Sequence, residues 1–225
     1  IHGQMIISCQ AVEGEPLYVE EKSIMYLMAR AAKQAGTPAI RTSSIRDVIA
    51  IKEETGLPVI GLVKVQYPGY EGFITPTMKE VDDLVAAGSD IVALDCTLRK
   101  RGDGSTVNEF IAQIREKYPD IILMADISNY EEGINAWKCG VDIVGTTMSG
   151  YTAYTSSVSD GPDYELMERL SRDINIPVIG EGRIHYPDQA VKALQTGAWA
   201  IVVGGAITRP LEIAMRFQNA IKESR

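Results

Sequence analysis

The sequence predicts a single-domain (β/α)8 TIM barrel, an α/β fold, and three observations lead to it. Short apolar runs alternate with longer stretches whose apolar residues recur at helical spacing, as at Ile24, Leu27 and Met28, and this alternation is typical of parallel β/α units. Eight such runs occur in 225 residues, whereas an open doubly wound sheet more often has about five or six strands. No linker rich in Pro, Gly or Ser divides residues 1–225, so we expect one domain.

The strands are recognised by what precedes them. In five places a helical stretch ends at a glycine and a run rich in Val and Ile begins about two residues later: Gly36, Gly56, Gly88, Gly140 and Gly197. Glycine suits the left-handed residue that closes a helix, and a parallel strand covered on both faces is apolar throughout. In chain order we expect strands at Met5–Cys9, Ala39–Arg41, Val59–Lys64, Ile91–Asp95, Ile121–Asp126, Ile143–Thr146, Val178–Gly180 and Ala200–Val203.

The helices that follow the strands have recognisable starts. A capping box places Ser or Thr three residues before Glu, so that each side chain satisfies a free backbone donor. The spacing occurs at Thr77 with Glu80, Thr106 with Glu109 and Ser128 with Glu131. A helical stretch from Leu211 to Lys222 follows the last strand and completes eight β/α units.

Composition and charge exclude several classes of protein. Hydrophobic residues make up 45% and charged residues 23% of the chain, which is the balance of a soluble globular protein. Lys and Arg number 22 against 30 Asp and Glu, a net charge of −8, which repels nucleic acid and anionic lipid. No apolar run reaches the ~18 residues of a membrane helix. We expect neither a nucleic-acid nor a membrane partner.

Cysteine and histidine usage indicates a cytoplasmic protein without a metal or cofactor. The three cysteines show no paired spacing, which argues against disulfides and a zinc knuckle and favours a reducing compartment. Two histidines do not readily build a multi-histidine metal site, and no dinucleotide or P-loop motif follows a strand. Because the sequence begins at Ile1 rather than Met, we expect that something before it was trimmed.

Polar residues follow the apolar runs where the strands end. They are Gln10, Arg41, Lys64, Asp95, Asp126, Thr146, Thr147, Glu181, Gly204 and Gly205. In this fold the chemistry is assembled at the C-terminal ends of the strands. One polar residue there is often only the first solvated position, but so many charges at one mouth are costly to desolvate without a ligand. We therefore predict a small-molecule site at this mouth.

Glycines and arginines mark a predicted phosphate site in the loops after strands seven and eight. Gly182 and Arg183 follow the seventh strand, and Gly204, Gly205 and Arg209 follow the eighth. Glycine lets backbone N–H groups approach phosphate oxygens, and arginine supplies positive charge. Tight turns and surface arginines are the alternative. Because both glycine-bearing loops stand at the two expected places, we favour a phosphorylated ligand.

Lys64 ends the most apolar run of the chain. Its ammonium is expected at a partly desolvated mouth, where burial lowers the lysine pKa and makes the amine a base near neutral pH or a Schiff-base nucleophile. The carboxylates of Asp126 and Glu181 act in the opposite direction, so burial must outweigh them.

Motifs along almost the whole chain resemble those of a known family. They include Ile7-Ser8-Cys9-Gln10, Ala39-Ile40-Arg41, Met124-Ala125-Asp126-Ile127-Ser128, Glu181-Gly182-Arg183-Ile184 and Val203-Gly204-Gly205-Ala206-Ile207-Thr208-Arg209-Pro210. The chain resembles the bacterial N-acetylmannosamine-6-phosphate 2-epimerases. The resemblance implies a metal-free β/α barrel that forms a homodimer and interconverts N-acetylmannosamine 6-phosphate and N-acetylglucosamine 6-phosphate in sialic-acid and amino-sugar catabolism.

The resemblance also implies roles for individual residues. Lys64 matches the family's catalytic lysine and Glu181 its partner carboxylate. Gln10, Arg41 and Asp126 match residues that orient the sugar and its N-acetyl group, and the two glycine loops match the phosphate site. Two other functions stay open: a Schiff-base lyase or aldolase acting on a phosphorylated sugar through Lys64, and a non-catalytic sugar-phosphate binding protein.

Overall fold

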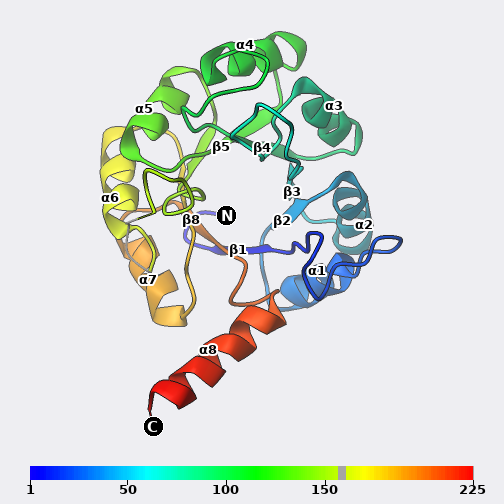
Figure 1. Cartoon of the computed structure of the whole chain (residues 1–225), viewed down its shortest axis with the longest axis vertical. Coiled ribbons are helices and arrows are strands. Elements are labelled where there is room, and N and C mark those ends of the chain that lie inside the picture. Colours follow the sequence, from blue (N-terminus) through cyan, green and yellow to red (C-terminus); the bar gives the residue numbers. More distant parts are fainter. Residues whose placement is uncertain (157–160, 225) are drawn as a thin grey trace.

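Eight parallel strands form a closed barrel in chain order in the computed structural model, which describes residues 1–156 and 161–224 (Figure 1). The strands are β1 (Met5–Ser8), β2 (Ile40–Ser43), β3 (Val59–Leu62), β4 (Ile91–Asp95), β5 (Ile122–Asp126), β6 (Ile143–Gly145), β7 (Val178–Glu181) and β8 (Ala200–Val203). The helices are α1 (Met25–Gln34), α2 (Ile45–Thr55), α3 (Met78–Ala86), α4 (Val107–Lys117), α5 (Tyr130–Lys138), α6 (Tyr164–Asp173), α7 (Pro187–Gln195) and α8 (Pro210–Glu223). The predicted barrel is confirmed.

The largest differences from the predicted strand ends are two residues, at β2 and β3. β3 ends at Leu62 because the chain then leaves the parallel sheet. Lys64 forms an isolated antiparallel bridge with Ile74, and the Val65 N–H donates to the Phe73 carbonyl at 3.0 Å. The main chain of Lys64 is therefore paired with the returning loop, and its side chain begins beyond the end of the strand.

The helix boundaries follow the predicted signals, with one correction. All five glycines before strands adopt positive φ, between 64° and 99°, and the capping boxes at Thr77 and Thr106 are present. The third pairing is wrong: Glu132, not Glu131, accepts from both the backbone N–H and the hydroxyl of Ser128, each at 2.7 Å. Asn129 takes the N-cap position, so the helix starts one residue later than predicted.

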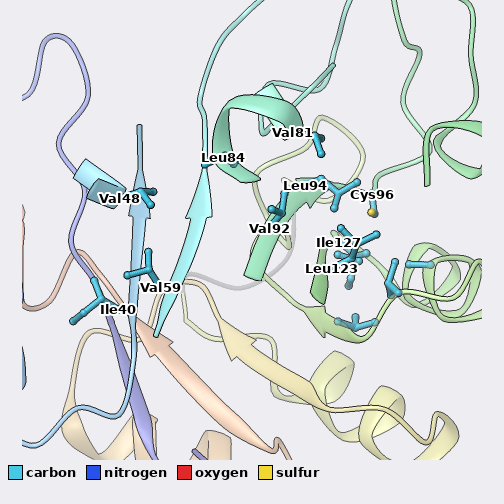
Figure 2. Close-up of a cluster of buried hydrophobic side chains, with 14 of the residues drawn as sticks. Ile40, Val48, Val59, Val81, Leu84, Val92, Leu94, Cys96, Leu123 and Ile127 are labelled. Carbon is cyan, nitrogen blue, oxygen red and sulfur yellow. The ribbon is translucent and has the colours of Figure 1, made fainter. Parts of the chain in front are cut away.

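Two apolar layers hold the barrel together. Outside it, strand residues such as Ile40, Val59 and Leu123 belong to the same cluster as Val48 of α2 and Leu84 of α3 (Figure 2). A second cluster fills the inside, with members that include Ile60, Ala93, Met124, Ile179 and Val202. Because successive strand residues point to opposite faces, every second residue points inward. The inward positions at the strand ends reach the mouth of the barrel.

The last helix, α8, does not cover the barrel as the other helices do. It extends away from the strands on the side between α7 and α1 (Figure 1), and none of its 14 residues, all of which the structure describes, is buried. Four of its apolar side chains are at least half exposed: Leu211, Met215, Phe217 and Ile221. In the described part of the chain no helix is long and apolar enough to cross a membrane.

Candidate active site

A cavity of about 410 Å³ opens at the C-terminal ends of the strands, a volume ordinary for a small-molecule site. Arg41, Glu181 and Lys64 line the cavity because they occupy inward-facing positions at or just beyond the C-terminal ends of β2, β7 and β3. Of the ten predicted site residues, nine line it: Gln10, Arg41, Lys64, Glu181, Gly182, Arg183, Gly204, Gly205 and Arg209. Asp126 does not line the cavity and is fully buried.

An arginine and two carboxylates form the floor of the cavity. Arg41, which is 1% exposed, donates to both carboxylate oxygens of Asp126, at 3.1 and 2.7 Å. This bidentate salt bridge joins β2 to β5 across the barrel. The Arg41 Nη1 atom also lies 3.4 Å from Glu181 Oε2. Burial alone would lower the pKa of Arg41, but Asp126 and Glu181 outweigh it and raise the pKa. Arg41 is therefore a fixed positive charge, and Asp126 holds it in place.

Thr147 connects the two carboxylates. Its hydroxyl oxygen lies 2.7 Å from Asp126 Oδ1 and 3.0 Å from Glu181 Oε2, yet a hydroxyl has only one proton to donate. Burial raises the pKa of Glu181, Arg41 opposes that rise, and the Asp126 charge adds to it. A proton on Glu181 would satisfy the second contact while Thr147 donates to Asp126. Glu181 is thus the carboxyl that can carry and release a proton.

Lys64 has the lowered pKa that the sequence predicted. The pKa is lowered to about 8: burial is the largest cause, the positive charges of Arg209 and Arg41 add to the shift, and Glu181 and Glu15 oppose it. With a pKa of about 8, roughly one tenth of the amine is neutral at pH 7, and this form can accept a proton. The amine and the Glu181 carboxyl both line the cavity, so a proton acceptor and a proton donor face one ligand.

The loops after β7 and β8 form the other end of the cavity. Gly182 and Arg183 both have positive φ, 112° and 54°, and such strained backbone in a non-glycine residue is common at functional sites. The Arg183 guanidinium lies 5.8 Å from the ring centre of Tyr151 and occupies the space where a side chain on Gly150 would lie. Arg209 lines the cavity but is paired with Glu15 at 3.0 Å and Glu212 at 2.9 Å.

Buried polar atoms without a protein partner surround the cavity. Within the described residues they include Gln10 Oε1, Arg41 Nε, Arg183 Nε and His185 Nδ1, all on side chains that line the cavity. Buried polar groups are nearly always hydrogen-bonded in folded proteins. Unpaired donors and acceptors at both ends of one cavity therefore indicate a polar ligand.

Sequence reasoning missed some cavity residues and included one that faces elsewhere. Thr147 was predicted only as a strand end, and no role was predicted for Tyr151, His185 and Glu212, which lie in loops and in the first turn of α8 rather than at strand ends. Asp95 does not line the cavity: it accepts from Thr97 and pairs with Arg99 at 2.5 Å. Among the described residues, no three or more His, Cys, Asp or Glu side chains are grouped to hold a metal ion.

Comparisons with known proteins agree on one family. A family profile described as "Putative N-acetylmannosamine-6-phosphate epimerase" matches residues 25–223. A relative from Caldanaerobacter subterraneus, a 2-epimerase by the same description, is 56% identical over 98% of this chain and 92% of its own. A Clostridium perfringens relative of that description is 49% identical, covering 99% of this chain and 98% of its own.

Solved structures give the same result for the fold. The structure of the N-acetylmannosamine-6-phosphate 2-epimerase from Clostridium perfringens superposes with a TM-score of 0.91 at 48% identity, covering 97% of this chain and 93% of that one. The thiamine phosphate pyrophosphorylase from Pyrococcus furiosus has a TM-score of 0.59 at 20% identity, covering 95% of this chain and 93% of its own. This second likeness concerns the barrel fold alone.

Proposed function

Because the chain belongs to the N-acetylmannosamine-6-phosphate epimerase family, we propose that it interconverts N-acetylmannosamine 6-phosphate and N-acetylglucosamine 6-phosphate in sialic-acid and amino-sugar catabolism. The observation that carries this proposal is that the Lys64 amine and the Glu181 carboxyl line one cavity, in which burial is the largest cause of a Lys64 pKa lowered to about 8. Inversion at C2 requires a base that removes a proton and a group that handles the proton of the neighbouring oxygen.

The chemistry of the substrate assigns the roles. A 2-acetamido sugar has an acidic C2–H only as its open-chain aldehyde, so the ring must open first. Glu181 exchanges a proton with the ring or carbonyl oxygen, and neutral Lys64 removes the C2 proton from one face. A proton returned to the opposite face of C2 completes the inversion. Arg41 stabilises the negative charge that develops on the oxygen. Asp126 acts through Arg41, because it holds the guanidinium in position. Gln10 orients the acetamide through its unpaired Oε1.

The phosphate binds at the far end of the cavity, at Gly182, Arg183, Gly204, Gly205 and Arg209. The bare backbone of the glycines and the unpaired Nε of Arg183 support this assignment. Binding energy from a remote phosphate orients the reacting carbon. The unphosphorylated sugar is therefore expected to be turned over poorly as well as bound weakly.

Proton NMR in D₂O tests the proposed reaction. With N-acetylmannosamine 6-phosphate as the substrate, we expect the gluco epimer to appear and deuterium to enter C2, because the proton removed by the base exchanges with solvent. An unchanged sugar that nevertheless binds would contradict the proposal and favour a sugar-phosphate binding protein. A covalent adduct trapped by borohydride would instead favour a Schiff-base lyase or aldolase acting through Lys64.

We also place the protein in the cytoplasm, as its free cysteines support, and propose that it is a homodimer held by α8. An isolated helix of 14 residues is marginal in water, and α8 exposes Leu211, Met215, Phe217 and Ile221. The neighbouring helices α7 and α1 also expose apolar residues: Val191 on α7 and Leu27 on α1. A second copy of α8 packed there would cover both surfaces.

Phe217, the most exposed of these side chains at 70%, provides the test of the dimer. We expect Phe217→Glu to convert a dimer into a monomer in size-exclusion chromatography with light scattering, because a carboxylate cannot be buried in an apolar contact. Gln218→Glu adds the same charge at the next exposed position of α8 and should leave the dimer intact. A wild-type monomer, or a dimer unchanged by Phe217→Glu, would contradict the proposal.

A further inference from the structure

The phosphate end of the cavity contains an acidic side chain that the reaction does not use. Glu212, in the first turn of α8, lines the cavity together with Gly204 and Gly205. Its carboxylate occupies the space where a side chain on Gly205 would lie. A negative charge therefore rests directly on the bare backbone that a phosphate group would approach.

Glu212 lies beside two arginines, which are the side chains that would also attract the phosphate of a ligand. Its Oε1 accepts from Arg209 Nη1 at 2.9 Å, and its Oε2 lies 4.0 Å from Arg216 Nη1. Arg216 also donates to the Gly205 carbonyl at 3.1 Å. Burial and then Arg216 lower the pKa of His185, and Glu212 opposes them. Glu212 thus acts electrostatically across the same end of the cavity.

We propose that Glu212 is an internal anion that occupies part of the phosphate site in the free protein and competes with the phosphate of the ligand. A dianionic phosphate and a carboxylate repel each other on the same glycine loop, so the ligand must displace Glu212 and take over Arg209. The side chain has room to move, because it is 40% exposed. This inference rests on the phosphate site proposed above.

The consequence is that competition from Glu212 lowers the affinity of the site for phosphate. Each sugar phosphate leaves a site in which Glu212 can return to Arg209, so release of ligand is favoured over retention.

Glu212→Gln tests the proposal because it removes the charge and keeps the shape. We expect the Kd for inorganic phosphate, measured by calorimetry, and the KM for N-acetylmannosamine 6-phosphate to fall by about twofold to fivefold, the effect of one partly exposed charge. We expect kcat to change by no more than about twofold. Glu223→Gln, an equal change of charge at the exposed far end of α8, should leave both constants unaltered.

The opposite sign would overturn the inference. If Glu212 instead positions Arg209 for the ligand, both constants rise in Glu212→Gln, and if Glu212 plays no part they stay the same. Calorimetry with inorganic phosphate decides between these outcomes without any turnover. Absence of epimerisation by the wild type, in contrast, would refute the proposed function and leave the phosphate measurement valid.

Discussion

Lys64→Ala is expected to lower kcat/KM for epimerisation by about a thousandfold or more, within the range that a positioned general base contributes. The amine lines the cavity, and with a pKa of about 8 it can alternate between accepting and returning a proton. The barrel is expected to stay folded, because the group removed is an ammonium whose burial is unfavourable. Turnover followed by NMR measures the loss of activity, and circular dichroism measures whether the barrel stays folded.

Two further lysine variants sharpen the result. Lys64→Arg keeps a positive charge but cannot supply a neutral base, so it should be as inactive as alanine. Lys79→Ala removes a lysine from an exposed ion pair on α3 and should retain wild-type activity. Near-normal epimerisation by Lys64→Ala would mean that another group removes the C2 proton.

The pH dependence follows from the same amine. The active form is neutral, and its fraction grows as pH rises through the pKa of about 8. We therefore expect kcat/KM to increase from about pH 6.5 and to level off above about pH 9, whereas an unperturbed lysine would still be gaining activity at about pH 10. A profile that falls across this interval would exclude neutral Lys64 as the base.

Asp126→Ala is expected to lower the free energy of unfolding by about 3–5 kcal/mol, because it removes the bidentate partner of the buried Arg41 and leaves only the longer 3.4 Å contact with Glu181. Both side chains are almost completely inaccessible to solvent. For a chain of this length such a loss corresponds to a decrease in Tm of roughly 10 °C. Epimerisation should be lost as well, since Arg41 would no longer be held toward Glu181. Urea unfolding and thermal melting measure the first effect.

A double variant separates stability from function. Arg41→Met with Asp126→Leu replaces both charges by apolar groups of similar volume, so we expect most of the stability to return without any activity. Asp83→Ala breaks the exposed Lys79–Asp83 pair and should cost less than about 1 kcal/mol. If Asp126→Ala proves as mild as Asp83→Ala, Arg41 must find another partner in the interior.

Local signals explain why so much of the fold could be predicted. A glycine with positive φ closes the helix before five of the strands, and both that glycine and the apolar run after it are visible in the sequence. The C-terminal ends of the predicted strands therefore identify Arg41, Lys64 and Glu181 from the sequence alone. The direction of the Lys64 pKa shift could be predicted as well, because burial at the end of an apolar strand is its largest cause.

The remainder depends on contacts between distant parts of the chain. Asp95 and Asp126 both end inward rows, yet Asp95 pairs with Arg99 four residues later, and Asp126 pairs with Arg41, 85 residues away. No local pattern distinguishes the two. The position of α8 is likewise invisible in the sequence, because its apolar residues fit a helix on the barrel as well as one that faces another molecule.

The Arg41–Asp126 pair also constrains how this chain can evolve. Changing either codon alone leaves a buried charge without its bidentate partner, so a lineage that abandons the pair must survive an unstable intermediate or acquire two mutations together. Much of the cavity wall above the pair, in contrast, comes from loops in which single mutations alter shape with little effect on folding. Descendants of this protein are therefore expected to acquire new substrates by mutation of the rim, while the charged floor is inherited unchanged.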